Sequence, residues 1–251
     1  MAEDWIYGVH ALAAALESGE VERMWVARER LRDHRIQSLV VRAQQLGIAP
    51  EEEAAKVLSK RCHSEQHQGV LARALPQPEP VWQDFLSGLG NDAFLLVLDG
   101  VQDPQNLGAC LRSAEAAGVH GVILPKDNAC GITGAVRKAA AGAASRLPVL
   151  RLTNLVRAVE DLQKKGYWVA GLAGDGAQSL YGADLRGPLV LVLGNEEKGI
   201  RRLLQERCDY LLHIPMLGQT ESLNVSVAAG IALFEVRRQR LAGEALPLAS
   251  R

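Results

Sequence analysis

The stretch from Ile214 to Phe234, IPMLGQTESLNVSVAAGIALF, predicts a strand that passes through a turn into a long helix. Pro215 and Gly218 interrupt the apolar pattern, and small polar residues follow before the apolar helix begins. In an open α/β sheet, a strand-to-helix turn of this kind exposes backbone groups at the edge where ligands bind. Because the stretch follows every other predicted strand, we expect it to complete a site that earlier loops have begun.

Outward from this stretch, the sequence from Ala93 onward alternates apolar runs with helical patterns. The run FLLVLD at 94–99 is continuously apolar, as expected for a strand that is buried on both faces. Repeated units of this kind predict a mostly parallel sheet with helices on both sides. We expect strands at 94–99, 118–125, 147–152, 167–174, 188–195 and 210–216, and helices ending at 117 and spanning 134–144, 154–165, 200–207 and 223–240.

The N-terminal part of the chain predicts a separate, smaller α/β domain. Pro76, Pro78 and Pro80 enforce an extended path, which marks a linker. The domains expected are 1–75, a linker at 76–92, a larger domain at 93–241, and a tail at 242–251 without a clear pattern. Within the first domain we expect helices at 9–16, 33–46 and 51–58, the last with acids in its first turn, and strands at 23–27 and 69–74.

Composition bounds the class of protein. The chain has 251 residues, of which 48% are hydrophobic and 23% are charged, so it suits a globular protein of one large or two smaller domains. Its formal net charge of −1 does not by itself indicate a nucleic-acid partner. The four cysteines form no CxxC pair and the histidines show no metal spacing, so we expect reduced thiols and no metal. No signal peptide and no run of about 18 apolar residues is present, which predicts a cytoplasmic protein without a membrane span.

Three loops at predicted strand ends carry unusual polar residues, at 103–112, 194–199 and 215–226. Ordinary turn and capping chemistry is the alternative for each loop, with Asn106 as an N-cap and Arg112 as a surface cation. Loops at the carboxyl ends of parallel strands share one edge of the sheet, which favours a common site. A dinucleotide fingerprint, a phosphate-cradling loop and a hydrolase elbow are all missing from the sequence.

Taken together, the three loops resemble the motifs of the SpoU branch of the SPOUT methyltransferases. The pattern N-x-G-x-x-x-R matches at 106–112, G-x-E-x-x-G matches at 194–199, and I-P-M…S-L-N-V-S-V-A matches at 214–228. The resemblance extends to IYGVHAL near the start and HQGVLAR at 67–73, so it covers almost the whole chain. One departure is Glu197, where the family usually has Gly.

The resemblance implies a trefoil knot and S-adenosylmethionine as methyl donor. It further implies 2′-O-methylation of a guanosine in the peptidyl-transferase P-loop of 23S ribosomal RNA, a homodimer, and an N-terminal RNA-binding module related to ribosomal protein L30e. The apolar faces of the Ala/Gly-rich helix and of the last helix are the surfaces expected to pair. Another ribosomal or transfer RNA site, or an RNA-binding protein without catalysis, are the alternatives. A nucleotide-using dehydrogenase is disfavoured by the missing fingerprint.

Residue roles follow from the resemblance in the same way. Since an arginine stays protonated, Arg112 is expected to stabilise the developing alkoxide or to hold a phosphate rather than act as a plain base. Asn106 and Glu196 are expected to orient Arg112 or the substrate, and replacement of Asn224 or Gly218 is expected to damage cofactor binding and knot packing together. The full set is catalytic Arg112, Asn106, Glu196, Ser222 and Asn224, with backbone contacts to the cofactor from Gly194, Ile214 and Leu223.

Overall fold

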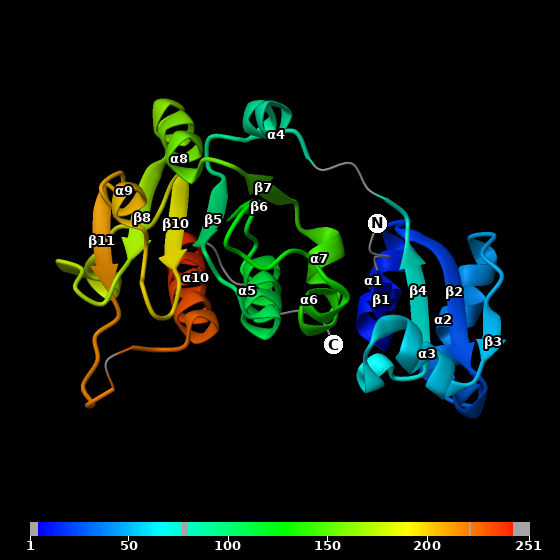
Figure 1. Ribbon diagram of the computed structural model, residues 1–251. Coiled ribbons are helices and arrows are strands. Elements are labelled where there is room, and N and C mark those ends of the chain that lie inside the picture. The colour runs from blue at the N-terminus through cyan, green and yellow to red at the C-terminus, as the bar shows by residue number, and fades with distance from the viewer. Residues whose placement is uncertain (1–4, 77–79, 221, 243–251) are drawn as a thin grey trace.

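The computed structural model of the protein describes residues 5–76, 80–220 and 222–242 (Figure 1). A small sheet near the N-terminus and a large sheet in the rest of the chain organise it. The predicted tail lies outside the described residues apart from Ala242, and so do residues 77–79 of the predicted linker. In the part of the chain that is described, no helix is long and apolar enough to cross a membrane.

The large sheet contains the strands β5 (Phe94–Asp99), β6 (Gly121–Pro125), β7 (Val149–Leu152), β8 (Trp168–Leu172), β9 (Gln178–Ser179), β10 (Leu189–Gly194) and β11 (Tyr210–His213). Their order is β7–β6–β5–β10–β8–β11–β9, and every neighbouring pair described is parallel. The central strands β5 and β10 are buried along almost their whole length, which explains their continuous apolar sequences. The short strand β9 was missed by the sequence patterns.

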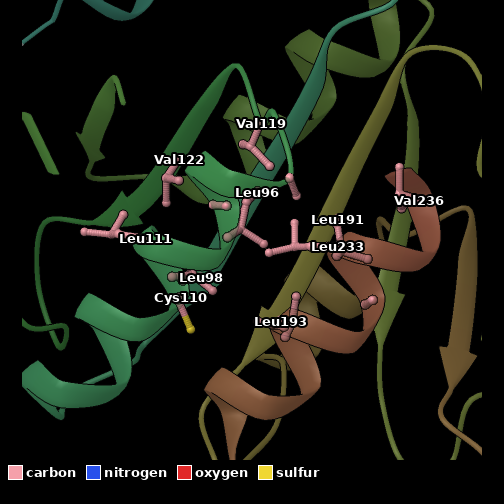
Figure 2. Close-up of a cluster of buried hydrophobic side chains, with 14 of the residues drawn as sticks. Leu96, Leu98, Cys110, Leu111, Val119, Val122, Leu191, Leu193, Leu233 and Val236 are labelled. Atoms are coloured by element: carbon pink, nitrogen blue, oxygen red, sulfur yellow. The ribbon is translucent and has the colours of Figure 1, made fainter. Parts of the chain in front are cut away.

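Helices cover both faces of the large sheet. One face carries α5 (Pro104–Ala116), α6 (Gly134–Ala139), α7 (Ala143–Arg146) and α10 (Val225–Leu241). The other face carries α4 (Trp82–Gly88), α8 (Leu155–Lys164) and α9 (Arg202–Gln205), and the short helix η3 (Leu180–Gly182) follows β9. Figure 2 shows the first face, where Leu96 and Leu98 of β5 and Leu191 of β10 lie against α5 and α10. Alternate residues of β5 pack into the core on the opposite face.

The N-terminal sheet contains β1 (Trp5–Tyr7), β2 (Val21–Ala27), β3 (Glu51–Glu53) and β4 (Val70–Ala74), in the order β1–β4–β2–β3. It packs with α1 (Val9–Glu17), α2 (His34–Gln45) and α3 (Ala55–Cys62), and η1 (Arg28–Arg30) and η2 (Glu65–His67) are short helices in the connections. The predicted α/β fold with a mostly parallel sheet and a small N-terminal α/β domain is confirmed.

The predicted helix at 51–58 is wrong in its first half. Residues 51–53 pair with β2 as a parallel strand, and the helix begins at Ala55. Glu51 accepts hydrogen bonds from Trp25 Nε1 at 3.1 Å and from Arg23 Nε at 3.2 Å. These partners are distant in sequence, so tertiary pairing overrides the local pattern of acids that favoured a helix start.

The predicted Ala/Gly-rich helix is also interrupted, because Ala141 and Gly142 adopt positive φ between α6 and α7. Its small residues serve a contact within the chain. A Cβ on Gly134 would lie 2.5 Å from the carbonyl oxygen of Trp5, and one on Gly142 would lie 2.6 Å from the Cβ of Ala14. The face that was expected to pair between subunits therefore packs against the N-terminal domain, beside α1 and β1 (Figure 1).

An ion pair also joins the N-terminal domain to the helices α6 and α7. Arg137 Nη1 of α6 donates to Glu20 Oε2 at 2.8 Å, and Ser145 Oγ of α7 donates to the same oxygen at 3.0 Å. The Arg137 and Glu20 side chains are only 13% and 12% exposed, so solvent screens this pair less than a surface pair. The N-terminal domain is thus joined to the large domain by packing and charge as well as by the linker.

We expect Glu20→Ala to lower the free energy of unfolding by about 1–3 kcal/mol, because it removes the shared acceptor of two largely buried donors. Denaturant unfolding of the purified protein measures this change. Glu17→Ala is the matched control, since Glu17 is exposed on α1 and should change stability by less than about 0.5 kcal/mol. Equal effects of the two substitutions would show that the contact does not contribute to stability.

The last part of the chain returns across the carboxyl edge of the large sheet. Strand β11 lies beyond β8, whereas α10 packs against α5 on the other side of β10. The described parts of the connection, 214–220 and 222–224, therefore pass back over the carboxyl ends of β8 and β10, beside the loop at 195–199. This crossing is the path that the predicted trefoil knot requires. The strand β11 ends at His213, so the predicted strand at 210–216 is too long and residues 214–216 belong to the crossing segment.

Candidate active site

A cavity of about 380 Å³ opens at the carboxyl edge of the large sheet, where the crossing segment meets the loop after β10. Gly194, Ile214, Ser222 and Leu223, all predicted from sequence, line this cavity. Its walls mix apolar side chains with backbone and polar groups, which suits a small organic ligand. The remaining lining residues are Leu172, Ala173, Gly174, Leu193, Asn195, Glu196, Glu197, Gly199, Met216, Val225 and Ala228.

A chain of hydrogen bonds ties the three predicted loops together beside this cavity. Asn106 Nδ2 donates to Glu196 Oε1 at 2.6 Å, and Asn224 Nδ2 donates to Asn106 Oδ1 at 2.9 Å. Asn224 Oδ1 in turn accepts from the backbone N–H of Ser226 at 2.9 Å and caps α10. Residues 106, 196 and 224 are thus brought together from positions far apart in sequence, as their location on neighbouring strand ends predicts.

Asn106 is not a helix cap. The side chain that caps α5 belongs to Asp103, whose Oδ1 accepts from the Gln105 N–H at 3.1 Å. Asn106 uses both ends of its amide in contacts to other loops. The capping alternative considered for this residue is therefore wrong, and the amide is committed to the polar chain at the site.

Arg112 lies apart from this polar chain. Six positions separate it from Asn106 on α5, so it is about 9 Å further along the helix axis and on a different side of the helix. Its side chain is exposed and makes no hydrogen bond or ion pair to any of the described residues. The expected contacts of Asn106 and Glu196 with Arg112 are not formed within the chain, since Glu196 pairs with Asn106 instead.

Asn195 and Ser226 are site residues that the sequence did not single out. Asn195 Nδ2 donates to the Gly100 carbonyl at 3.1 Å, and its Oδ1 accepts from the Glu197 N–H at 2.9 Å, which fixes the loop after β10. Ser226 Oγ donates to Asn224 Oδ1 at 2.6 Å. Asn195 occupies a variable position of the second motif and Ser226 belongs to the third, and these motif positions were the available sequence clue.

Gly218 has no close neighbours in the structure. Its neighbourhood is open, with no atom within 4 Å of the position that a Cβ would occupy, and its φ is not in the left-handed region. This open space gives no steric reason for a replacement of Gly218 to damage the knot, and measurement of the Gly218→Ala variant tests the expectation. The close approach belongs to Gly194, where a Cβ would lie 1.9 Å from the Gly199 carbonyl carbon and 2.1 Å from the Ile200 nitrogen.

Cys110 packs behind the polar chain and is fully buried. Burial raises the pKa of its thiol to about 12, and the negative charge of Glu196 adds to this shift. The thiol is therefore protonated at neutral pH, and the thiolate is the nucleophilic form. Burial and protonation therefore both disfavour this cysteine as a nucleophile.

Comparison with known proteins agrees with this geometry. A family model described as the SpoU rRNA methylase family matches residues 93–234, and one described as RNA 2′-O ribose methyltransferase substrate binding matches residues 5–80. The chain is 46% identical over 242 residues to the 23S rRNA (guanosine-2′-O-)-methyltransferase RlmB of Shewanella oneidensis, covering 95% of this chain and 98% of that protein. It is 45% identical to the protein of the same name from Vibrio vulnificus, over 97% and 100% of the two chains.

A solved structure shares the fold. The SpoU methyltransferase AviRb from Streptomyces viridochromogenes, in complex with AdoMet, superposes with a TM-score of 0.81 at 26% identity, covering 96% of this chain and 92% of that one. Fold and site together define a methyltransferase of the knotted α/β class with an added N-terminal domain. The chain belongs to the SpoU rRNA methylase family.

Proposed function

We propose that this protein transfers a methyl group from S-adenosylmethionine to the ribose 2′-hydroxyl of a guanosine in the peptidyl-transferase P-loop of 23S ribosomal RNA. The observation that carries the proposal is the hydrogen-bonded chain Glu196–Asn106–Asn224 beside the cavity at the crossing segment. Relatives that align over nearly their whole length carry the name of this activity. The solved relative named above binds the same methyl donor.

The cavity fits the methyl donor in size and in chemistry. A volume of about 380 Å³ lies within the range of small-molecule sites. Leu193, Ile214 and Leu223 offer apolar walls for an adenine ring, and the backbone at Gly194 offers polar groups at its edge. When bound, the donor supplies a methyl group on a positively charged sulfur, and it needs neither a metal nor a phosphate-binding loop.

The polar chain orients the nucleophile. Glu196 holds the Asn106 amide at 2.6 Å, so the position of this amide is fixed before the substrate arrives. Asn224 is held by Ser226 in the same way, and Ser222 adds a hydroxyl at the cavity wall. We assign to these groups the alignment of the ribose 2′-hydroxyl with the methyl group, for which in-line geometry can contribute roughly 7–11 kcal/mol to the lowering of the barrier.

The second part of the proposal is a homodimer in which Arg112 of the partner subunit completes the site. Arg112 is exposed and lies away from the polar chain of its own subunit. Next to α5, the helix α10 is apolar on its outer side as well, with Val227 49% exposed and Phe234 51% exposed. From Val225 to Phe234 this helix carries apolar or small residues all round, and the exposed Arg237 and Arg238 follow only in its last turns. Such an apolar surface is normally covered. A second copy packed on this surface brings a guanidinium toward a facing site.

A charge on the outer face of α10 should break the dimer. We expect Phe234→Glu to convert the protein to a monomer, because it buries a carboxylate without a partner in the interface. Sedimentation of the purified variant measures the mass directly. Val41→Glu on α2 is the matched control, since Val41 is 52% exposed and should leave the mass unchanged. A dimeric Phe234→Glu variant would place the interface on another surface.

The remaining parts of the proposal concern domains and location. We propose that residues 1–75 form a unit that holds the RNA, that 76–92 is a linker, and that 93–241 is the methyltransferase domain. The match of the substrate-binding family model to residues 5–80 supports the first assignment. We place the protein in the cytoplasm, where ribosomal RNA is processed.

One assay tests the activity. Purified protein is incubated with labelled S-adenosylmethionine and 23S ribosomal RNA from a strain that lacks the modification, and 2′-O-methylation is mapped. We expect label at one guanosine of the P-loop. Label at another ribosomal or transfer RNA nucleotide would overturn the assigned target, and RNA binding without any transfer would overturn the activity.

A further inference from the structure

A second cavity, of about 390 Å³, lies on the other side of the loop at 195–199. It is distinct from the cavity at the crossing segment, although Asn195, Glu197 and Gly199 line both. The loop therefore forms a wall between two spaces at the carboxyl edge of the sheet. The other residues that line the second cavity are Asp99, Gly100, Gln102, Asn128, Lys198 and Arg201.

Arg201 is held in place at this cavity by a buried carboxylate. Asp99, which ends β5 and is 1% exposed, accepts from Arg201 Nε at 2.7 Å and from the Arg201 backbone N–H at 2.9 Å. The Arg201 side chain is nevertheless 57% exposed. Its guanidinium is therefore oriented in advance, while part of its donor set stays open to a ligand, which lowers the entropic cost of binding.

Lys198 adds a positive charge to this cavity that Asp99 does not neutralise. The positive charge of Arg201 is balanced by Asp99, whereas Lys198 is exposed and its ammonium makes no hydrogen bond or ion pair to the described residues. Two amide side chains, from Gln102 and Asn128, line the same cavity and each carries donors and an acceptor. Asn128 adopts a φ of 58°, a left-handed conformation that asparagine tolerates better than most residues.

We propose that this second cavity binds the nucleotide next to the methylated guanosine, on the condition that the proposed RNA methylation holds. Lys198 and Arg201 contact the phosphate, since charge-assisted hydrogen bonds to phosphate oxygens are short and strong. The amides of Gln102 and Asn128 contact the edge of the base. Placing one nucleotide on each side of the loop fixes the register of the RNA strand, so that one ribose faces the polar chain.

The position of the loop at 195–199 between the two cavities supports this assignment. Asn195 Nδ2 binds the Gly100 carbonyl at the second cavity, and the neighbouring residue Glu196 binds Asn106 at the first. A single rigid loop therefore couples the two spaces. Consecutive nucleotides of an unstacked RNA strand can straddle it, because single-stranded RNA presents splayed bases to proteins.

Glu197 places a negative charge near the proposed phosphate position. It lines both cavities, is exposed, and its carboxylate makes no hydrogen bond or ion pair to the described residues. A carboxylate at this position repels an RNA phosphate. The neighbours Glu197 and Lys198 therefore have opposite effects on RNA binding, which gives the proposal a test in two directions.

The first experiment compares three variants by their RNA KM, by RNA binding at several salt concentrations and by calorimetric S-adenosylmethionine binding. We expect Lys198→Ala to raise the RNA KM about tenfold and to reduce the salt dependence of binding by about 0.7–0.9 in log–log slope. Glu197→Gln should lower the RNA KM about twofold to threefold. Lys164→Ala, at an exposed lysine near the opposite edge of the sheet, should change neither quantity.

The second experiment tests the base contact. An RNA with an abasic nucleotide on either side of the target guanosine is compared with the intact RNA, using wild type and Asn128→Ala. We expect one of the two abasic positions to weaken binding to wild type about tenfold and to have no effect on Asn128→Ala.

Three outcomes would overturn either the inference or the proposed function. If Lys198→Ala behaves like Lys164→Ala, the cavity is not a nucleotide site. If Lys198→Ala weakens S-adenosylmethionine binding and leaves RNA binding unchanged, the cavity holds part of the cofactor and the inference is wrong. If wild-type protein transfers no methyl group to RNA, the proposed function itself fails, which the unmodified protein reports independently of the variants.

Discussion

Arg112→Ala is expected to reduce methyl transfer at least about 1,000-fold in kcat, because it removes the cation that stabilises the oxygen developing negative charge. S-Adenosylmethionine binding should stay within about twofold of wild type, since Arg112 does not line the cofactor cavity. Single-turnover transfer with labelled donor and calorimetric binding of the donor separate these two quantities. Arg157→Ala, an exposed arginine on α8, is the control and should be fully active.

Mixing variants shows which subunit supplies the arginine. An Arg112→Ala subunit and an Asn224→Ala subunit are each inactive alone, but a mixed dimer has one site with both an intact Asn224 and Arg112 of the partner subunit. Random pairing of equal amounts gives half mixed dimers, each with one good site of two, so about a quarter of wild-type activity should return.

Two results would contradict the assignment of Arg112 to the site of the partner subunit. Activity near zero after subunit exchange means that each site uses its own arginine, and α5 would then have to move to bring Arg112 to the polar chain. Near-normal activity of Arg112→Ala alone would remove this residue from the chemistry altogether. Arg112→Lys should stay strongly impaired, because an ammonium lacks the planar fork of donors.

The sequence predicted which polar residues lie together better than it predicted the contacts that they make. Strand ends of a parallel sheet meet at one edge, so Asn106, Glu196 and Asn224 were expected to lie together, and they do. Arg112 was grouped with them because it belongs to the same motif. Helical geometry separates Asn106 from Arg112 along and around α5, and motif spacing alone gives no sign of which subunit an arginine serves.

The errors in the fold come from long-range contacts. A run of acids at 51–53 suits a helix start locally, but Trp25 and Arg23 bind Glu51 from another strand. The Ala/Gly-rich segment at 134–144 suits one close-packed helix, but the N-terminal domain needs Gly142 in a left-handed conformation to approach. Both depend on partners far away in the chain, which local patterns do not contain.

Two glycines near the crossing segment also show that local sequence does not reveal long-range contacts. Gly194 and Gly218 both lie in motif loops, and sequence gives no reason to rank them. In the structure, a Cβ on Gly194 would overlap the backbone of Gly199 and Ile200 at 1.9–2.2 Å, whereas Gly218 has open space around it. The end of β10 and the return of its loop touch backbone to backbone, with Asn195 N and Gly199 O at 3.1 Å.

Gly194→Ala should therefore destabilise the protein by about 3 kcal/mol or more, because backbone atoms cannot rotate away as a flexible side chain does. Any folded protein that remains should bind S-adenosylmethionine more than about tenfold more weakly, since the displaced loop forms a wall of the cofactor cavity. Denaturant unfolding measures the first effect, and calorimetry on the soluble fraction measures the second.

Gly218→Ala is the matched control for this substitution, with the same added methyl group in a loop of the same site. Its stability should change by less than about 0.5 kcal/mol, and its affinity for the donor should stay near wild type. A tolerated Gly194→Ala variant would mean that the loop at 195–199 shifts freely, and the rigid wall between the two cavities would have to be abandoned. A damaging Gly218→Ala variant would instead mean that the crossing segment closes over the bound donor and leaves no room there.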